Sequence, residues 1–401
     1  MDMTSEYKFL SDYAEIKGGK RLPKGKNLIS TPTDHPYIRV RDLGSDKVLE
    51  LTTDYEYVDD DTQSVISRYT VNSGDVIISI VGTIGLVGKI GVSLNGANLT
   101  ENCAKIVNLH GLNADYLYYY LTSVNGQNAI SAGTVGAVQP KLPLKSIQAL
   151  PIPVMSIGEQ TAIAETLSAL DAQIAENKKI NHHLEQMAQA IFKSWFVDFE
   201  PFGGVMPDNW KIGHLTDIAD YLNGLAMQRF RPTEDEIGLP VLKIKELRQG
   251  SCDASSELCS PSIRTDYIVH DGDVIFSWSG SLLVDFWCGG DCGLNQHLFK
   301  VTSRHYDKWF YYAWTCHHLT EFISMAADKA TTMGHIKRDA LEKAEVIIPD
   351  DEGFRQIGEL LAPLYDQIIN NRIESRNLSQ LRDTILPKLM SGEISVEEAS
   401  V

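Results

Sequence analysis

The sequence of residues 158–196, GEQTAIAETLSALDAQIAENKKINHHLEQMAQAIFKSWF, decides the fold of this chain. Apolar residues and two asparagines recur at spacings of four and three, which is typical of a helix face that packs against another helix. The positions are Ile163, Leu167, Leu170, Ile174, Asn177, Asn181, Leu184, Ala188, Ile191 and Trp195. No Pro and no internal Gly interrupts the stretch, so we expect one helix of roughly 55–60 Å. A stripe this long and narrow predicts a spacer or a dimerisation rod that needs a partner helix.

The partner helix is expected in the same chain, because the pattern returns near the C-terminus at a constant offset of 194 residues. The matched pairs are Ile163/Ile357, Leu167/Leu361, Leu170/Leu364, Gln173/Gln367, Ile174/Ile368, Asn177/Asn371, Leu184/Leu378 and Ile191/Ile385. We therefore predict an intramolecular antiparallel pair in which Asn177 faces Ser375 and Asn181 faces Asn371. Buried Asn at such positions fixes register at some cost in stability. Pro363 predicts a kink or a shortened second helix.

The duplication extends beyond the helices. Residues 10–19, 35–43, 73–79 and 99–105 are similar, in the same order, to residues 215–224, 239–247, 271–277 and 294–300. Two copies of one globular unit, each followed by one long helix, are the simplest account. We expect an α+β chain of two mainly-β domains whose helices form an antiparallel coiled coil with pseudo-twofold symmetry. The predicted boundaries are 1–155 for the first domain, 156–197 for its helix, 198–210 for a linker, 211–350 for the second domain and 351–401 for the C-terminal helix and tail.

Period-two alternation of apolar and basic residues predicts strands at residues 37–43 and 241–247. Gly-Asp turn signals precede further expected strands at residues 76–81 and 274–278. Aromatic-rich segments predict helices at residues 114–122 and 306–325. Residues 81–88 (Gly-punctuated), 128–138 and 326–336 are expected to be loops.

Composition bounds the class of protein. The chain has 401 residues, 43% of them hydrophobic, and a formal net charge of −17, which argues against indiscriminate binding of polyanions. Absence of an eighteen-residue apolar run and of a signal-like N-terminus predicts no membrane span and a cytoplasmic location. Four of the six cysteines (Cys252, Cys259, Cys288 and Cys292) suggest zinc with nearby histidines, but their spacing is atypical. Reduced thiols and no metal are the prediction.

No sequence motif supports an active site in this chain. The spacing of Gly82, Gly85 and Gly88 is not that of a dinucleotide-binding loop. A P-loop, a methyltransferase tetrapeptide, a nuclease core and a local hydrolase signature are also missing from the sequence. We therefore predict a binding protein, and regard a stand-alone nuclease or methyltransferase as remote.

Local basic segments are the candidates for DNA contacts. Arg39 with Arg41, and Lys243 with Lys245, would each place two cations on one face of a predicted strand. A solvated outer strand face is the alternative for both pairs. Further basic candidates flank them: Lys20, Arg21, Lys24, Lys26, Arg229 and Arg231. Loop candidates for contacts to base edges are Thr134, Gln139, Lys141, Thr331, Thr332, His335, Lys337 and Arg338.

The chain resembles the specificity subunit of a type I restriction-modification system. The resemblance spans essentially the whole chain, and is carried by the doubled plan of globular unit plus helix and by short motifs in the helical regions. These motifs are Leu150-Pro-Ile-Pro153, Glu159-Gln160, Leu170-Asp171, Ile174, Phe192-x-x-Trp195-Phe196-Val-Asp-Phe-Glu-Pro-Phe202 and Leu386-Pro-Lys-Leu-Met-Ser-Gly-Glu-Ile394.

The resemblance implies a division of labour. Each globular unit would be a target recognition domain that recognises one half of a bipartite double-stranded DNA site, at a distance set by the helices. Two methyltransferase (modification) subunits would bring S-adenosylmethionine, and restriction/translocase subunits would bring ATP and Mg, so that this chain binds no cofactor itself. A coiled-coil scaffold that tethers two partners without binding DNA remains the alternative. A gel-shift of the chain with and without a methyltransferase partner separates the two hypotheses.

Overall fold

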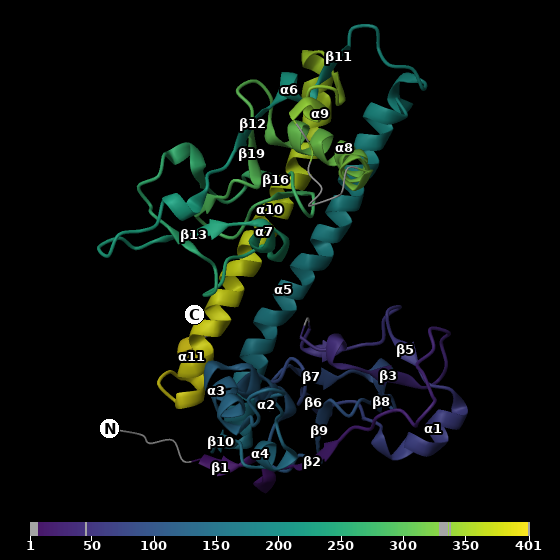
Figure 1. The fold of residues 1–401 in the computed structure, drawn as a ribbon, viewed down its shortest axis with the longest axis vertical. Helices are drawn as coiled ribbons and strands as arrows, with labels where there is room; N and C mark the ends of the chain where they lie inside the picture. The colour runs from purple at the N-terminus through teal and green to yellow at the C-terminus, as the bar shows by residue number, and fades with distance from the viewer. Residues whose placement is uncertain (1–6, 45, 329–335, 337, 400–401) are drawn as a thin grey trace. The chain divides into compact units, whose positions relative to one another are not determined.

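The computed structural model describes residues 7–44, 46–328, 336 and 338–399. The chain divides into two compact units, unit 1 (Met1–Ala172 with Ser379–Val401) and unit 2 (Gln173–Leu378). Two long helices, α5 (Ile157–Phe192) and α10 (Asp351–Ser391), each contribute one part to each unit (Figure 1). The prediction of two long helices separated by a globular segment is confirmed.

Unit 1 contains a five-stranded sheet of order β2-β9-β6-β7-β4, a three-stranded sheet of order β5-β3-β8 and the pair β1-β10. The strands are β1 (Tyr7–Phe9), β2 (Glu15–Gly18), β3 (Pro36–Ile38), β4 (Val48–Leu49), β5 (Glu56–Tyr57), β6 (Val76–Ser79), β7 (Val87–Ile90), β8 (Asn98–Leu99), β9 (Cys103–Val107) and β10 (Pro151–Pro153). The helices are α1 (Asp60–Ile66), α2 (Ala114–Thr122), α3 (Val124–Gly133), α4 (Leu144–Gln148) and, after α10, α11 (Val396–Ala399).

Unit 2 repeats this topology. Its sheets have the orders β12-β19-β16-β17 and β14-β13-β18-β15, with the pair β11-β20. Among the described residues, nine strands therefore match between the units in the same order, while β4 and β15 have no counterpart. The strands are β11 (Lys211–His214), β12 (Asp220–Asn223), β13 (Leu239–Leu242), β14 (Leu258–Cys259), β15 (Ile268–Val269), β16 (Val274–Ser277), β17 (Leu283–Phe286), β18 (Cys292–Leu294), β19 (Leu298–Thr302) and β20 (Glu345–Ile348). The helices are α6 (Leu215–Ile218), α7 (Ile244–Gln249), α8 (Lys308–Asp328) and α9 (Arg338–Leu341).

A glycine directly follows β2 in unit 1 and β12 in unit 2, for the same reason. A Cβ at Gly19 would collide with the carbonyl oxygens of Leu99 and Thr100, and a Cβ at Gly224 would collide with those of Leu294 and Asn295. The residue after each glycine donates its N–H to the first of these carbonyls, Lys20 to Leu99 at 2.8 Å and Leu225 to Leu294 at 2.9 Å. The chain therefore crosses between sheets at van der Waals contact with another backbone, which only glycine permits. The duplication predicted from sequence is thus present at the level of single contacts.

Each unit has its own core, built from one sheet face, one aromatic helix and parts of the two long helices. In unit 1, buried side chains of β6 and β9 pack with α2 and with Ile163 and Leu167 of α5 and Leu389 of α10. In unit 2, β16 and β19 pack with α8 and with Phe192 of α5 and Leu361 of α10. The stripe quoted above is therefore buried where it meets the other long helix within each unit.

The predicted asparagine layer is confirmed in unit 2. Asn177 donates to the hydroxyl of Ser375 at 3.3 Å, and Asn371 donates to the amide oxygen of Asn181 at 2.8 Å. Gln173 donates to Asn177 and Gln367 donates to Asn371, one turn earlier on each helix. Residue numbers rise on α5 as they fall on α10 along these contacts, so the helices run antiparallel.

Three local predictions are wrong. The strands expected at residues 37–43 and 241–247 end at Ile38 and Leu242, and the chain turns into a 3₁₀ helix and α7. Residues 128–133, expected in a loop, belong to α3, whose N-cap Ser123 accepts the N–H of Gly126. The shortening expected as one outcome at Pro363 does not occur, since α10 runs through this residue and the neighbouring Leu361 and Tyr365 are buried; the kink stays a prediction.

Helix α2 agrees with the expected 114–122 at both ends, since Asn113 accepts the N–H groups of Asp115 and Tyr116 and so begins it. The predicted 306–325 helix is α8, and the expected loop beyond it lies largely outside the described residues. Among the helices that the structure describes, none is both long and apolar enough to cross a membrane.

Candidate nucleic-acid interface

The basic segment of unit 1 follows Gly19 and is held by apolar anchors. Leu22 and Leu28 pack against a small cluster that includes Tyr37, Ile66 and Tyr69. The Tyr37 hydroxyl donates to the carbonyl oxygen of Lys20 at 2.8 Å. Because the leucines point into this cluster, the cations between them are left on the surface: Lys20, Arg21 and Lys24 are exposed, and Lys26 is half-buried.

The four cations of this segment differ in the side chains that they contact. Arg21 pairs with Glu101 at 2.6 Å, and Lys26 pairs with Asp59 at 3.0 Å. Hydrogen bonds from Thr62 and then from Lys26 lower the pKa of Asp59 to about 2. Lys20 lies over the ring of Tyr69 at 5.5 Å, and among the described residues Lys24 has no ion-pair partner.

Sequence reasoning missed Arg68 as a member of this surface. Arg68 is exposed on the 3₁₀ helix Ser67–Tyr69, directly before the tyrosine that lies under Lys20. Within the described part of the chain it has no acidic partner. An Arg-Tyr pair just after a short helix was a visible signal, but nothing in the sequence shows that the chain returns here beside the basic segment.

Arg39 and Arg41 do not share a strand face. Asp42 accepts the N–H of Arg39 at 2.6 Å, which ends β3 and begins a 3₁₀ turn. In unit 2, Glu246 accepts the N–H of Lys243 at 3.3 Å and begins α7. An acidic side chain three residues after the cap satisfies an N–H that a strand would have used in pairing. The strands predicted from period-two alternation therefore end early, because a capping acid begins a helical turn in each.

One carboxylate holds two candidate cations together in unit 1. Glu56 forms ion pairs with Arg39 and, at 3.0 Å, with Arg41. Arg41 also donates to the backbone oxygen of Asp54 at 3.1 Å. The side chains of Arg39 and Glu56 are 30% and 27% exposed, so this pair is partly shielded from water.

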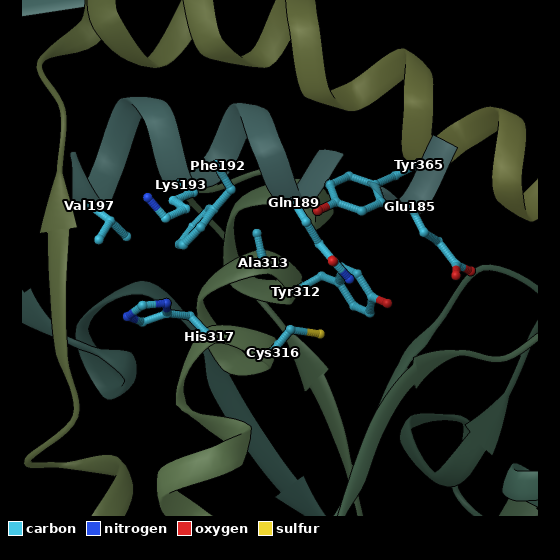
Figure 2. A pocket seen from close by; sticks show the side chains of 10 residues that line it. All are labelled: Glu185, Gln189, Phe192, Lys193, Val197, Tyr312, Ala313, Cys316, His317 and Tyr365. Carbon is cyan, nitrogen blue, oxygen red and sulfur yellow. The ribbon is translucent and has the colours of Figure 1, made fainter. Parts of the chain in front are cut away.

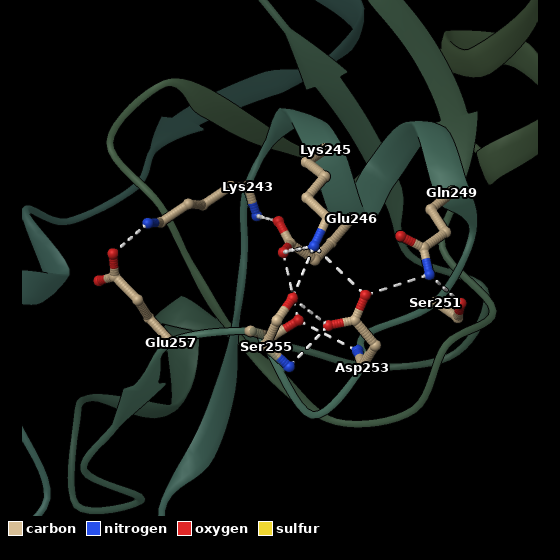
Figure 3. Close-up of polar contacts among 9 residues, drawn as sticks. Lys243, Lys245, Glu246, Gln249, Ser251, Asp253, Ser255 and Glu257 are labelled. Atoms are coloured by element: carbon tan, nitrogen blue, oxygen red, sulfur yellow. Dashed lines mark hydrogen bonds and ion pairs between the residues drawn. The ribbon is translucent and has the colours of Figure 1, made fainter. Parts of the chain in front are cut away.

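One carboxylate does the same in unit 2. Glu257 pairs with Lys243 at 2.6 Å and with Arg231 at 3.2 Å, and the hydrogen bond from Lys243 is the largest cause of the lowered pKa of Glu257. Figure 3 shows Lys243 pointing to Glu257, while Lys245 points to Asp253 and Ser255. The structure thus brings Arg231 and Lys243 together, although they are twelve residues apart, and separates Lys243 from Lys245.

The loop candidates of unit 1 lie on a short projecting turn. Thr134 ends α3, and Val135 and Lys141 exchange backbone hydrogen bonds of 2.9 Å in each direction. Gly136 has a φ of 95°, which closes the turn, and the intervening Gln139 is exposed. A projecting amide can make a bidentate contact with adenine, and a projecting lysine can reach a phosphate.

The remaining candidates of unit 2 are partly described. Arg229 ends the 3₁₀ helix Met227–Arg229, whose Met227 is buried, and its exposed side chain has no ion pair among described residues. Arg338 is exposed at the start of α9. Thr331, Thr332, His335 and Lys337 lie outside the described residues.

A separate cavity of about 350 Å³ lies in unit 2 between α5, α8 and α10. Figure 2 shows Phe192, Tyr312, Ala313, Cys316 and Tyr365 around it, with the polar groups of Glu185, Gln189, Lys193 and His317 near its rim. Burial raises the pKa of the Cys316 thiol to about 12, so the thiol is protonated at neutral pH. Its aromatic lining suits an apolar group rather than acid–base chemistry.

Comparisons with known proteins agree with this architecture. A family model for the type I restriction modification DNA specificity domain matches residues 3–186 and residues 207–376. The chain is 26% identical over 421 residues to the specificity subunit of the type I restriction enzyme MjaIX from Methanocaldococcus jannaschii, covering 98% of this chain and 94% of that protein. It is 27% identical over 318 residues to the EcoKI specificity subunit of Escherichia coli, covering 70% and 66%.

The fold is shared with the crystal structure of the type I restriction-modification S subunit from M. genitalium, at a TM-score of 0.58, 14% sequence identity and 97% coverage of each chain. A duplicated α+β unit with long helices is thus the architecture of a known class of protein. The chain belongs to the type I restriction-modification DNA specificity family.

Proposed function

We propose that this chain recognises a bipartite double-stranded DNA site, with one half-site bound by each globular domain. The observation that carries the proposal is the repetition of one topology in two units, each with cations at the strand that follows the glycine crossing. Two similar but not identical surfaces suit two different half-sites. We take residues 1–155 and 211–350 as the recognition domains, the helices at 156–197 and 351–401 as the spacer, and 198–210 as the linker.

Within each domain the candidates divide by chemistry. Lysines and arginines of the basic segments, such as Lys24 and Arg229, would contact phosphates and set orientation. Gln139 would face base edges and supply sequence preference, and the loop candidates that end at Arg338 would do the same in the second domain. The net charge of −17 makes such local contacts the main source of attraction to DNA.

Partner subunits would supply the chemistry. Two methyltransferase subunits would bring S-adenosylmethionine, and restriction/translocase subunits would bring ATP and Mg, while this chain provides DNA specificity without catalysis. The aromatic cavity of unit 2 supports contact with a protein partner, since it is open and lined by Phe192, Tyr312 and Tyr365. Filling it by Ala313→Trp should weaken assembly with the methyltransferase, measured by co-purification.

The decisive experiment is DNA binding by the chain assembled with its methyltransferase partner. Lys24→Ala and Arg229→Ala should each weaken binding to all sequences and reduce the salt slope by about 0.9, because each removes one phosphate contact. Lys211→Ala is the matched control, since this exposed lysine of β11 lies outside the basic segments. An assembled complex that binds no DNA at low salt would instead favour the tethering scaffold.

A further inference from the structure

At one equivalent place in each unit, a carboxylate bridges two of the candidate cations. Glu56 belongs to β5, which pairs with β3, and it bridges Arg39 and Arg41 just beyond the end of β3. Glu257 directly precedes β14, which pairs with β13, and it bridges Lys243 and Arg231 just beyond the end of β13.

The two bridges share one ion pair at repeated positions but differ in the origin of the second cation. Arg39 and Lys243 are matched by the repeat, but their second cations come from opposite sides in sequence: Arg41 follows Arg39, whereas Arg231 precedes Lys243. Two different local sequences have therefore reached the same charge arrangement.

The bridging carboxylates are not the acids that cap the turns after β3 and β13. The turns after β3 and β13 begin with other acids, Asp42 and Glu246, which accept the backbone N–H groups. Glu56 and Glu257 are 27% and 38% exposed, so their ion pairs are only partly shielded, and solvent screening limits what they add to stability. Their position, each in contact with two candidate DNA-binding cations, indicates a role in binding.

We propose that Glu56 and Glu257 occupy the phosphate-binding cations when the DNA is not the cognate site, and so weaken binding to non-specific DNA. This inference rests on the proposed DNA-recognition function. A carboxylate offers an arginine or lysine the same charge-assisted hydrogen bonds as a phosphate does. Loosely held DNA gains too little binding free energy from the cations to displace the carboxylate. DNA that base contacts hold in register brings its phosphates to the cations and displaces the carboxylate.

The physical consequence differs between the two kinds of DNA. Non-specific binding comes almost entirely from phosphate contacts, and each contact adds about 0.9 to the slope of log affinity against log salt. Removing one bridging carboxylate frees two cations, so the non-specific slope should steepen by up to about 1.8. The cognate slope should stay unchanged, because those contacts are already made in the cognate complex.

The test uses the full chain assembled with its methyltransferase, and the DNA site defined by mapping methylated positions in the host genome. Glu56→Gln and Glu257→Gln keep size and hydrogen bonding while removing the charge. Asp34→Asn and Glu234→Gln are matched controls, because each removes one exposed charge from the same unit without an ion pair among the described residues. Glu56→Asp keeps the charge and should behave as the wild type.

The expected result is non-specific affinity raised about fivefold per substitution, the Coulomb factor for one unit charge about 4 Å away in water, with a steeper non-specific slope. Unchanged slopes on both DNAs, or equal steepening on both, would overturn the inference. Thermal unfolding of each variant checks that the fold is intact. Failure of the wild-type assembly to bind any DNA would refute the proposed function itself, which is a distinguishable outcome.

Discussion

The asparagine layer of unit 2 gives the sharpest stability prediction. Asn371 donates to the side-chain oxygen of Asn181 at 2.8 Å, and Asn181 donates to the backbone oxygen of Ile368 at 3.2 Å. These asparagines are only 5% and 7% exposed, so neither can turn to water when its partner is removed. Asn371→Leu or Asn181→Leu alone should therefore cost about 1–3 kcal/mol, the penalty for a buried polar group left unpaired.

The double substitution should cost much less than the sum of the two. Replacing both partners by apolar side chains leaves no orphaned group between them and adds apolar burial. We expect a coupling energy of about 1–3 kcal/mol, the usual range for residues in direct contact. Gln367, which donates to Asn371, is exposed and can bond to water instead. Asn370→Leu is the matched control, because this neighbouring asparagine is exposed on the same helix.

Tryptophan fluorescence makes the measurement specific to unit 2. All six tryptophans lie between Trp195 and Trp314, inside the Gln173–Leu378 unit, so urea unfolding followed by their emission reports on this unit alone. The free energies are comparable only if the urea slope m is the same for all variants. If the costs of the two single substitutions sum to the cost of the double substitution within about 0.5 kcal/mol, the two asparagines are not coupled and the prediction is refuted.

Three further predictions concern other features. Gly19→Ala and Gly224→Ala should each destabilise their own unit by roughly 1–3 kcal/mol, since the added Cβ meets backbone carbonyls; circular dichroism would follow the first and tryptophan emission the second. Burial opposes ionisation of Asp271, but hydrogen bonds from Arg376 and from the Gly290 N–H, with the nearby positive charge, together outweigh burial and lower the pKa. The resulting stability is present above the usual Asp pKa and should be lost as the pH falls through the lowered pKa of the folded state. Arg376→Gln should flatten this acid loss in tryptophan-monitored unfolding. Inserting one heptad into both long helices should lengthen the preferred DNA spacer, measured with a series of sites, and an unchanged spacer would exclude the helices as the ruler.

Local periodicity was enough to predict the long helices and their register. The seam recurs over ten positions, and the matched asparagines identify which layers face one another, so Asn177 and Ser375 meet as expected. Helix α2 was also predictable, because its cap and its apolar face are contained in consecutive residues. Each of these features depends on residues close together in sequence or on a simple repeat.

The candidate site was less predictable because its contacts are long-range. Nothing near Arg39 in the sequence indicates that Glu56 will bind it, since that contact depends on the pairing of β3 with β5. The strand predicted through Arg39 failed for a local reason, the capping acid Asp42, which period-two counting ignores. Surface charge patterns therefore predicted the wrong arrangement of these cations, and their role in DNA contacts stays a prediction.

The two copies share contacts that hold the backbone in place but differ in their surface residues. Ser79 and Ser277 donate to carbonyls four residues on in their respective units, at 2.6 and 2.8 Å, and the glycine crossings are also identical. These residues recur because both copies need them to adopt the same backbone conformation. The residues after the crossings do not repeat: Lys20 and Arg21 stand in one copy, and Leu225 and Ala226 in the other. If each copy recognises a different half-site, its surface must diverge while its interior cannot. If the bridging carboxylates act as proposed, their recurrence on the diverged surface would reflect a demand of DNA binding rather than of folding.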